Sequence, residues 1–291
     1  MKIITSKTNM QQSVLELKKQ GKTIGFVPTM GYLHDGHLQL IKNAVRTNDI
    51  TVVSIFVNPL QFGPNEDLDA YPRDLESDKE LAEKAGVDFL FTPDTAEMYP
   101  NDMSMKLEVM NRTNVLCGRS RPGHFNGVAT VLVKLFNIIL PNHVFFGIKD
   151  AQQTAVVESI IEDFNFPIKI IAVETVREQD GLAKSSRNVY LNDLERQQAP
   201  ELYRSLRKAE KAVQNGERDP NIIIQIVKEH VDGNTDGILD YIEVLSYPQL
   251  SYQSRLHGKM IVAIAVKFSK ARLIDNIILT VNKEATSCSA Q

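Results

Sequence analysis

The sequence has little cysteine, no long apolar run and no excess of basic charge. Cys117 and Cys288 are its only cysteines, so neither a disulfide framework nor a cysteine-based zinc site is indicated. No window reaches the about 18 to 20 apolar residues that a membrane span needs, and the N-terminus lacks the apolar core of a signal peptide. The 33 basic residues against 36 acidic ones argue against a protein that coats nucleic acid by bulk charge. These absences predict a cytoplasmic protein without nucleic-acid or membrane partners.

Two common nucleotide-binding motifs are also missing. The sequence contains neither G-x-G-x-x-G nor G-x-x-x-x-G-K-[ST], so neither a dinucleotide fold nor a Walker A loop is predicted. Its 43% hydrophobic and 24% charged residues are typical of a globular protein that can bury a sizeable core. A length of 291 residues favours about two domains.

The first part of the chain alternates between strand and helix patterns. Apolar runs typical of strands buried on both faces lie at 23–28, 50–58, 87–93, 143–148 and 168–174. Helical patterns lie between them at 37–48, 73–86, 126–140 and 150–164. This alternation predicts an α/β fold, with a Rossmann-like doubly wound parallel sheet.

The rhythm changes past about residue 180. Helical patterns at 193–216 and 220–232 are followed by strand patterns at 239–247, 260–268 and 271–279. Helices followed by strands predict a smaller α+β C-terminal domain. We therefore expect a first domain at 1–183, the α+β domain at 184–283 and a disordered tail at 284–291.

The stretch FVPTMGYLHDGHLQLI, residues 26–41, places two histidines where the first apolar run gives way to a helix pattern. Ligands of parallel α/β sheets gather at the carboxyl ends of strands, where a helix N-terminus favours phosphate. His34 and His37 could each donate a hydrogen bond to a phosphate oxygen, while Gly36 leaves the backbone open to a nucleotide. The spacing is equally compatible with a helix cap and two surface histidines. A metal site is disfavoured, because the pair lacks i, i+4 spacing and a nearby cysteine.

Longer motifs carry a family resemblance. PTMGYLHDGHL resembles the HIGH-type signature of the nucleotidyltransferase superfamily. The chain also contains NPLQFGPNEDLDAYPRD at 58–74, RPGHFNGVATVL at 121–132, FFGIKDAQQ at 145–153 and TVREQDGLAKSSRN at 175–188. In this order the motifs resemble those of the pantothenate synthetases, or pantoate–β-alanine ligases.

The resemblance implies an AMP-forming ligase that joins pantoate to β-alanine in the biosynthesis of pantothenate and coenzyme A. ATP would activate pantoate as a pantoyl-adenylate, with release of pyrophosphate and then AMP. The first domain would bind the nucleotide and pantoate, Mg²⁺ would accompany ATP, and the chain would form a homodimer. Two alternatives stay open: a nucleotidyltransferase acting on a phosphorylated alcohol, and a catalytically silent nucleotide-binding module.

The resemblance also implies which residues bind ATP. They are Met30, Gly31, Tyr32, Leu33, His34, Asp35, Gly36, His37, Gly147, Ile148, Lys149, Asp150, Val176, Lys184, Ser185, Ser186 and Arg187. Among them His34, His37, Lys149 and Arg187 are the candidate catalytic residues. Taken alone, Lys149 fits a solvated surface lysine and the SSRN stretch fits a helix cap, while Asp150 fits a helix N-cap as well as a ribose contact.

Two glutamines are the candidate substrate ligands. By the match Gln61 and Gln153 bind pantoate, and Gln61 also reaches β-alanine; an amide suits a neutral polyol with a carboxylate. Without the match they would be exposed glutamines of a loop and a helix. Lys184 stands where many members have Met, and either adds a phosphate contact or points outward. Asp78 lies where the family can place a magnesium ligand, and the metal ligands stay unassigned.

Overall fold

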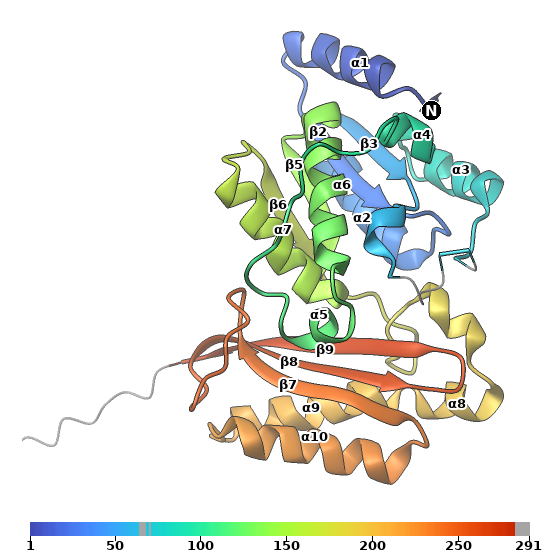
Figure 1. The fold of residues 1–291 in the computed structure, drawn as a ribbon. Helices are drawn as coiled ribbons and strands as arrows, with labels where there is room; N and C mark the ends of the chain where they lie inside the picture. The colour runs from blue at the N-terminus through green and yellow to red at the C-terminus, as the bar shows by residue number, and fades with distance from the viewer. Residues whose placement is uncertain (64–67, 70, 283–291) are drawn as a thin grey trace, which may run out of the picture. The chain divides into compact units, whose positions relative to one another are not determined.

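The computed structural model describes residues 1–63, 68–69 and 71–282. The chain forms two compact units, one of Met1–Val176 with Lys184–Ser186 and one of Arg177–Ala183 with Arg187 onward (Figure 1). Along the sequence, the chain thus enters the second unit at Arg177, returns to the first for Lys184–Ser186 and continues in the second from Arg187. The domain boundaries expected from the sequence, 1–183 and 184–283, stay a prediction. The tail expected at 284–291 lies outside the described residues.

The first unit contains a parallel sheet of six strands in the order β1-β4-β3-β2-β5-β6. The strands are β1 (Lys2–Ile4), β2 (Ile24–Thr29), β3 (Ile50–Ile55), β4 (Phe89–Phe91), β5 (His143–Gly147) and β6 (Lys169–Val173). The helices are α1 (Lys7–Lys19), α2 (Asp35–Thr47), α3 (Leu75–Lys84), α4 (Thr95–Met98), α5 (Leu116–Ser120), α6 (His124–Ile139) and α7 (Ala151–Asp163). Two 3₁₀ turns, η1 (Pro59–Gln61) and η2 (Ile148–Asp150), follow β3 and β5. The predicted α/β fold is confirmed.

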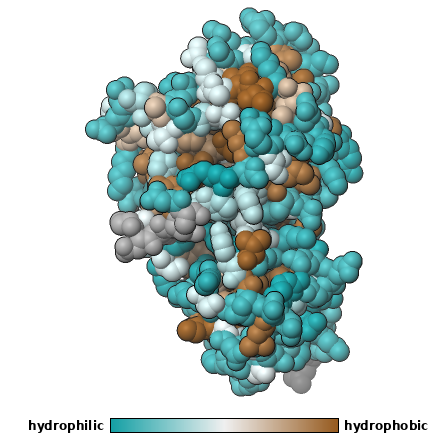
Figure 2. All heavy atoms as spheres, turned by 90° about the vertical axis from the view of Figure 1, so that its right-hand side faces the viewer, coloured by the Kyte–Doolittle hydropathy of each residue, from teal (hydrophilic) through white to brown (hydrophobic). Residues whose placement is uncertain are grey.

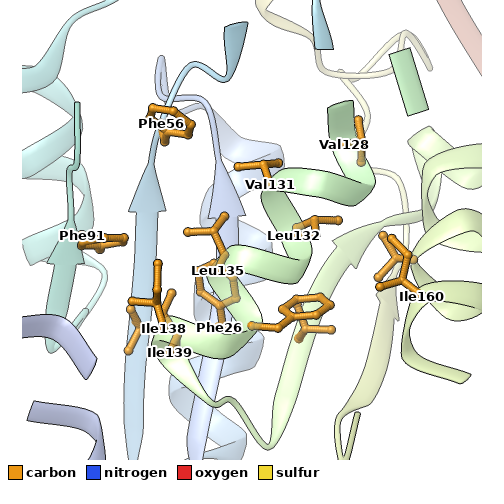
Figure 3. Packing of buried hydrophobic residues seen from close by; sticks show 14 of the residues in the cluster. Phe26, Phe56, Phe91, Val128, Val131, Leu132, Leu135, Ile138, Ile139 and Ile160 are labelled. Carbon is orange, nitrogen blue, oxygen red and sulfur yellow. The ribbon is translucent and has the colours of Figure 1, made fainter. Parts of the chain in front are cut away.

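Helices cover both faces of this sheet because alternate residues of each strand point to opposite sides. On one face, Phe26 of β2 belongs to a buried cluster with α6, whose apolar side chains point at the strands in Figure 3. On the other face, Val27 lies in a second buried cluster with Leu40 and Ile41 of α2. Burying each such side chain contributes about 1.5 to 3 kcal/mol. The amphipathic α2 is thereby fixed against the sheet at the end of β2.

The strand order creates a switch point beside β2. From β2 the chain runs through β3 to β4 on one side, and later returns to place β5 and β6 on the other. In such sheets ligands bind where neighbouring strands lead off in opposite directions, at the carboxyl ends. The loops after β2 and β5 therefore meet where a nucleotide site is expected.

The second unit contains an antiparallel sheet in the order β7-β8-β9. Its elements are η3 (Ser186–Tyr190), whose first residue belongs to the first unit, α8 (Asp193–Gln198), α9 (Glu201–Gln214), α10 (Pro220–Asn234), β7 (Ile238–Ser246), β8 (Gly258–Lys267) and β9 (Arg272–Val281). Leu206 of α9 and Val227 of α10 share a buried cluster with Val262 of β8. The helices therefore pack on the sheet, as predicted for an α+β unit.

The helical pattern predicted at 193–216 forms two helices rather than one. Helix α8 ends at Gln198 and α9 begins at Glu201, with Pro200 between them. Proline has no N–H to donate to a preceding carbonyl, and its ring clashes with the previous turn. The helical pattern therefore continues in a second helix rather than through the proline.

The described part of the chain contains no helix that could span a membrane. No helix there combines the length and apolar character that a bilayer crossing requires. The face in Figure 2 is mainly hydrophilic and carries small, separate hydrophobic groups.

Candidate active site

The loop between β2 and α2 is shaped by a carboxylate from α3. Gly31 and Tyr32 have φ of 86° and 52°, in the left-handed region that side chains disfavour. Asp78, whose residue is 2% exposed, accepts the backbone N–H of Tyr32 at 2.8 Å and of Leu33 at 2.6 Å. A Cβ at Gly31 would lie 2.8 Å from the Asp78 Oδ2 atom, so the close approach requires glycine. Burial raises the pKa of the Asp78 carboxyl, while the two N–H donors oppose that rise.

The two histidines cap α2 through their Nδ1 atoms. His34 is the N-cap residue, and its Nδ1 accepts the Gly36 N–H at 3.1 Å. The Nδ1 of His37 accepts the backbone N–H of His34 at 3.4 Å, which completes a capping box. A ring nitrogen that accepts carries no proton, so each neutral imidazole holds its proton on Nε2. The helix-cap interpretation and the phosphate-site interpretation are therefore compatible.

Both imidazoles are half-buried rather than on the surface, and they are neutral at pH 7. Burial, then the neighbouring His34 and the charge of Lys149, lowers the pKa of His37 to about 3. Burial first and Lys149 second lower the pKa of His34 to about 4. The ring centroids lie 4.2 Å apart. The pair thus offers two Nε2–H donors without adding positive charge.

Lys149 supplies a cation beside the histidines. It lies in η2, directly after β5, and β5 is the neighbour of β2 in the sheet. Its Nζ donates to the backbone carbonyl of Lys184 at 3.1 Å, and its charge acts on both imidazoles. Lys149 is half-buried and held, so it is not a freely solvated surface lysine.

The segment predicted as the second nucleotide signature returns to the same edge of the sheet. The Lys184 N–H donates to the Val176 carbonyl at 2.9 Å, which closes a small hairpin. The Lys184 Nζ lies 3.1 Å from Asp35 Oδ2, at the first turn of α2. The Lys184 side chain therefore makes an ion pair with Asp35. Arg187 belongs to the second unit, and its expected contact with a phosphate stays a prediction.

Asp150 occupies the N-cap position of α7, but its side chain makes no cap hydrogen bond. The residue is exposed, directly after Lys149. Asp150 was expected either to cap α7 or to contact a ribose, and the cap hydrogen bond is not formed. The carboxylate stays available at the carboxyl end of β5, where a ribose hydroxyl could donate to it.

Gln61 is buried next to the signature loop. It ends η1, is 8% exposed, and its Nε2 lies 2.9 Å from Met30 Sδ. His124 Nδ1 lies 2.7 Å from the Gln61 backbone carbonyl, which fixes the main chain at this residue. The alternative of an exposed loop glutamine is therefore wrong. The contact with Met30 joins the NPLQF segment to the loop after β2.

Two successive glutamines at the start of α7 have different surroundings. Gln152 is 5% exposed, and its Nε2 donates to the carbonyls of Arg112 and Val115, each at 2.8 Å. Its Oε1 accepts the Gly118 N–H at 3.2 Å. Gln153 is half-exposed, and among the described residues its side chain has no hydrogen-bond partner. Gln152 therefore holds the fold, whereas the Gln153 amide is available to a ligand.

Sequence reasoning missed the supporting role of three residues, Asn58, His124 and Asp78, the last of which was considered only as a magnesium ligand. Asn58, which is 1% exposed, contacts Gln61 and the backbone of α6. His124 and Asp78 hold backbone groups of the two key loops. Asn58 and His124 lie within motifs that carry the family resemblance, and that was the available signal. Nothing local marks Asp78 as the partner of a loop 45 residues earlier.

The family model for pantoate-beta-alanine ligase matches residues 2–278. The chain belongs to the pantoate-β-alanine ligase family. The pantothenate synthetases of Bacillus cytotoxicus and Geobacillus thermodenitrificans are 57% identical over 281 residues and 58% over 283. Each match covers 97% of this chain, and 100% and 98% of the relative, respectively.

Solved structures agree with the family assignment. Pantothenate synthetase from Thermus thermophilus is 41% identical with a TM-score of 0.90, covering 97% of this chain and 100% of that one. Pantoate-β-alanine ligase from Francisella tularensis, complexed with beta-gamma ATP and β-alanine, is 35% identical with a TM-score of 0.78, covering 96% and 97%. The expected enzyme class is confirmed: the protein is an ATP-dependent ligase that condenses pantoate with β-alanine. The two alternative functions find no support among these relatives.

Proposed function

We propose that the condensation proceeds in two steps at the carboxyl ends of β2 and β5. The pantoate carboxylate attacks the α-phosphorus of ATP, which forms pantoyl-adenylate and releases pyrophosphate. The amine of β-alanine then attacks the acyl carbon, which forms the amide of pantothenate and releases AMP. The observation that carries this proposal is the grouping of two neutral imidazoles and the Lys149 ammonium at the switch point.

Electrostatics explains the division of roles. Bringing a carboxylate to a phosphate about 4 Å away costs about 4 kcal/mol at an effective dielectric of 20. Lys149 offsets this repulsion with its charge. His34 and His37 donate Nε2–H to oxygens that gain charge during transfer, and the N-terminus of α2 adds its dipole. Ser185, Ser186 and Arg187 hold phosphate oxygens as the family match implies.

The remaining roles extend the assignment to pantoate, metal and assembly. Gln61 and Gln153 bind pantoate, and Gln61 also reaches β-alanine. Mg²⁺ would accompany the ATP phosphates. Asp78 does not fit as its ligand, because the residue is only 2% exposed and both of its carboxylate oxygens already accept backbone N–H groups. Within the described residues no group of three or more His, Cys, Asp or Glu side chains is arranged for a metal. Family resemblance supports a cytoplasmic homodimer.

The two-step course predicts that pantoate alone supports exchange of labelled pyrophosphate into ATP. Adenylation involves only pantoate and ATP, while β-alanine acts afterwards as the nucleophile. Exchange should be measured with each acid separately and with both together. Exchange that required β-alanine would rule out a free-standing adenylation step, and exchange without pantoate would rule out pantoate as the acyl donor.

The successive glutamines predict a contrast between two variants. Gln153→Ala should raise the Michaelis constant for pantoate about 5- to 150-fold, because polar substrate groups lose a partner worth ~1 to 3 kcal/mol. The constant for ATP should hardly change. Gln152→Ala serves as the matched control: it leaves three backbone groups unpaired and should lower the unfolding midpoint. Equal losses for pantoate and ATP in Gln153→Ala would show that Gln153 shapes the whole site.

A further inference from the structure

Gln61 is held by a chain of hydrogen bonds that begins at Tyr99, the residue after α4. The Tyr99 hydroxyl lies 2.9 Å from Asn58 Oδ1, and Asn58 Nδ2 lies 3.3 Å from Gln61 Oε1. Burial raises the pKa of the Tyr99 hydroxyl above its usual range, so the group stays protonated and can donate at any working pH. These hydrogen bonds link Tyr99, which lies outside the predicted site, to Gln61, a residue proposed to bind pantoate.

The backbone decides which way the Asn58 amide points. The Leu60 N–H, which can only donate, faces Asn58 Oδ1 at 3.3 Å. The Gly127 carbonyl, which can only accept, faces Asn58 Nδ2 at 3.0 Å. The oxygen of Asn58 therefore points to Leu60 and the Tyr99 hydroxyl, and its NH₂ group points to Gly127 and Gln61.

The orientation of Asn58 then sets that of Gln61. A donor at Asn58 Nδ2 requires an acceptor opposite it, so the Gln61 oxygen faces Asn58. The Gln61 NH₂ group faces the signature loop, with Met30 Sδ at 2.9 Å. An NH₂ group carries two hydrogens, so a second hydrogen remains for a ligand.

We propose that Tyr99, acting through Asn58, is a positioning residue that presents Gln61 to the substrate as a hydrogen-bond donor. Gln61 then recognises an acceptor of pantoate, a carboxylate oxygen or a hydroxyl lone pair, and not a hydroxyl hydrogen. This inference rests on the proposed role of Gln61 in pantoate binding and adds the direction of its hydrogen bond.

Two substitutions at Gln61 test the direction. At pH 8, Gln61→Ala should raise the Michaelis constant for pantoate about 5- to 150-fold through loss of the donor. Gln61→Glu should raise it further, because a charged acceptor replaces the NH₂ group and faces another acceptor. If Gln61→Glu binds pantoate as well as the parent or better than Gln61→Ala, Gln61 accepts from pantoate and the inference is wrong. If Gln61→Ala has no effect, the pantoate assignment fails with it.

Tyr99→Phe tests the positioning. The variant keeps the ring that packs near Phe56, with centroids 6.2 Å apart, and removes only the hydroxyl. The Michaelis constant for pantoate should rise about 2- to 10-fold, with that for ATP and the unfolding midpoint nearly unchanged. Tyr252→Phe, which removes a hydroxyl bonded to Glu243, is the control and should change neither constant. An unchanged Michaelis constant for pantoate in Tyr99→Phe, or equal changes in the constants for pantoate and ATP, would overturn the inference. The proposed two-step reaction is tested separately, by pyrophosphate exchange in the parent protein.

Discussion

His37→Ala is expected to lower the rate of adenylation about 100-fold or more, the range for one lost transition-state donor. The His37 imidazole is neutral, with its pKa near 3, and its Nδ1 is engaged by the His34 N–H. Its proposed contribution is therefore an Nε2–H donated to a phosphate oxygen, which alanine lacks. Pyrophosphate exchange measures this loss directly. The unfolding midpoint should barely move, because the capping contact at 3.4 Å is long.

Two further measurements separate catalysis from structure in this variant. His257→Ala, at an exposed histidine of the second unit, is the matched control and should keep full activity. Between pH 6.5 and 4 an unfolded histidine binds a proton that folded His37 does not, so acidification through this window destabilises the parent protein. His37→Ala should lose less stability over the same range. An active variant, or one inactive only because it unfolds, would reassign His37 to structure.

Lys149→Met is expected to lower adenylation about 100- to 1000-fold, as for loss of one preorganised group at developing charge. Methionine keeps much of the length and removes the cation. Because the Lys149 charge lowers the pKa of both His34 and His37, these values should rise in the variant. Pyrophosphate exchange gives the rate, and the imidazole signals in an NMR titration give the direction of the shift.

Lys228→Met, on the exposed face of α10, is the control for removing one lysine charge. It should leave both the exchange rate and the histidine titrations unchanged. A Lys149→Met rate within a few-fold of the parent would remove Lys149 from the phosphate site. A large loss without any shift of the histidine pKa values would show that the lysine acts at a distance from the imidazoles.

The alternating strand and helix patterns predicted most of the first unit, because each buried strand is a continuous apolar run. Strand β1 was not predicted, since its three residues are too short to show a pattern. The break between α8 and α9 was missed because the helical pattern resumes directly after Pro200. Hydrophobic patterns show which face of an element is apolar, but they do not show where one helix ends and the next begins.

The candidate site divides in the same way between local and distant information. His34, His37 and Lys149 lie in contiguous motifs at strand ends, where position together with the family resemblance suggests a phosphate role. The supports of the site come from far along the chain: Tyr99 reaches a residue 41 positions away. A single sequence carries no signal for such pairs, because a hydrogen bond between distant residues leaves no local period.

The dependence of the β2–α2 loop on Asp78 means that the signature motif is contiguous in sequence without being self-sufficient in structure. Its two left-handed residues turn successive N–H groups inward, and an internal carboxylate occupies the position where an anion would otherwise sit. A peptide of residues 26–41, or the same stretch grafted between a strand and a helix of another protein, would lack that internal counterpart. The unit that can be transplanted is therefore the loop together with α3.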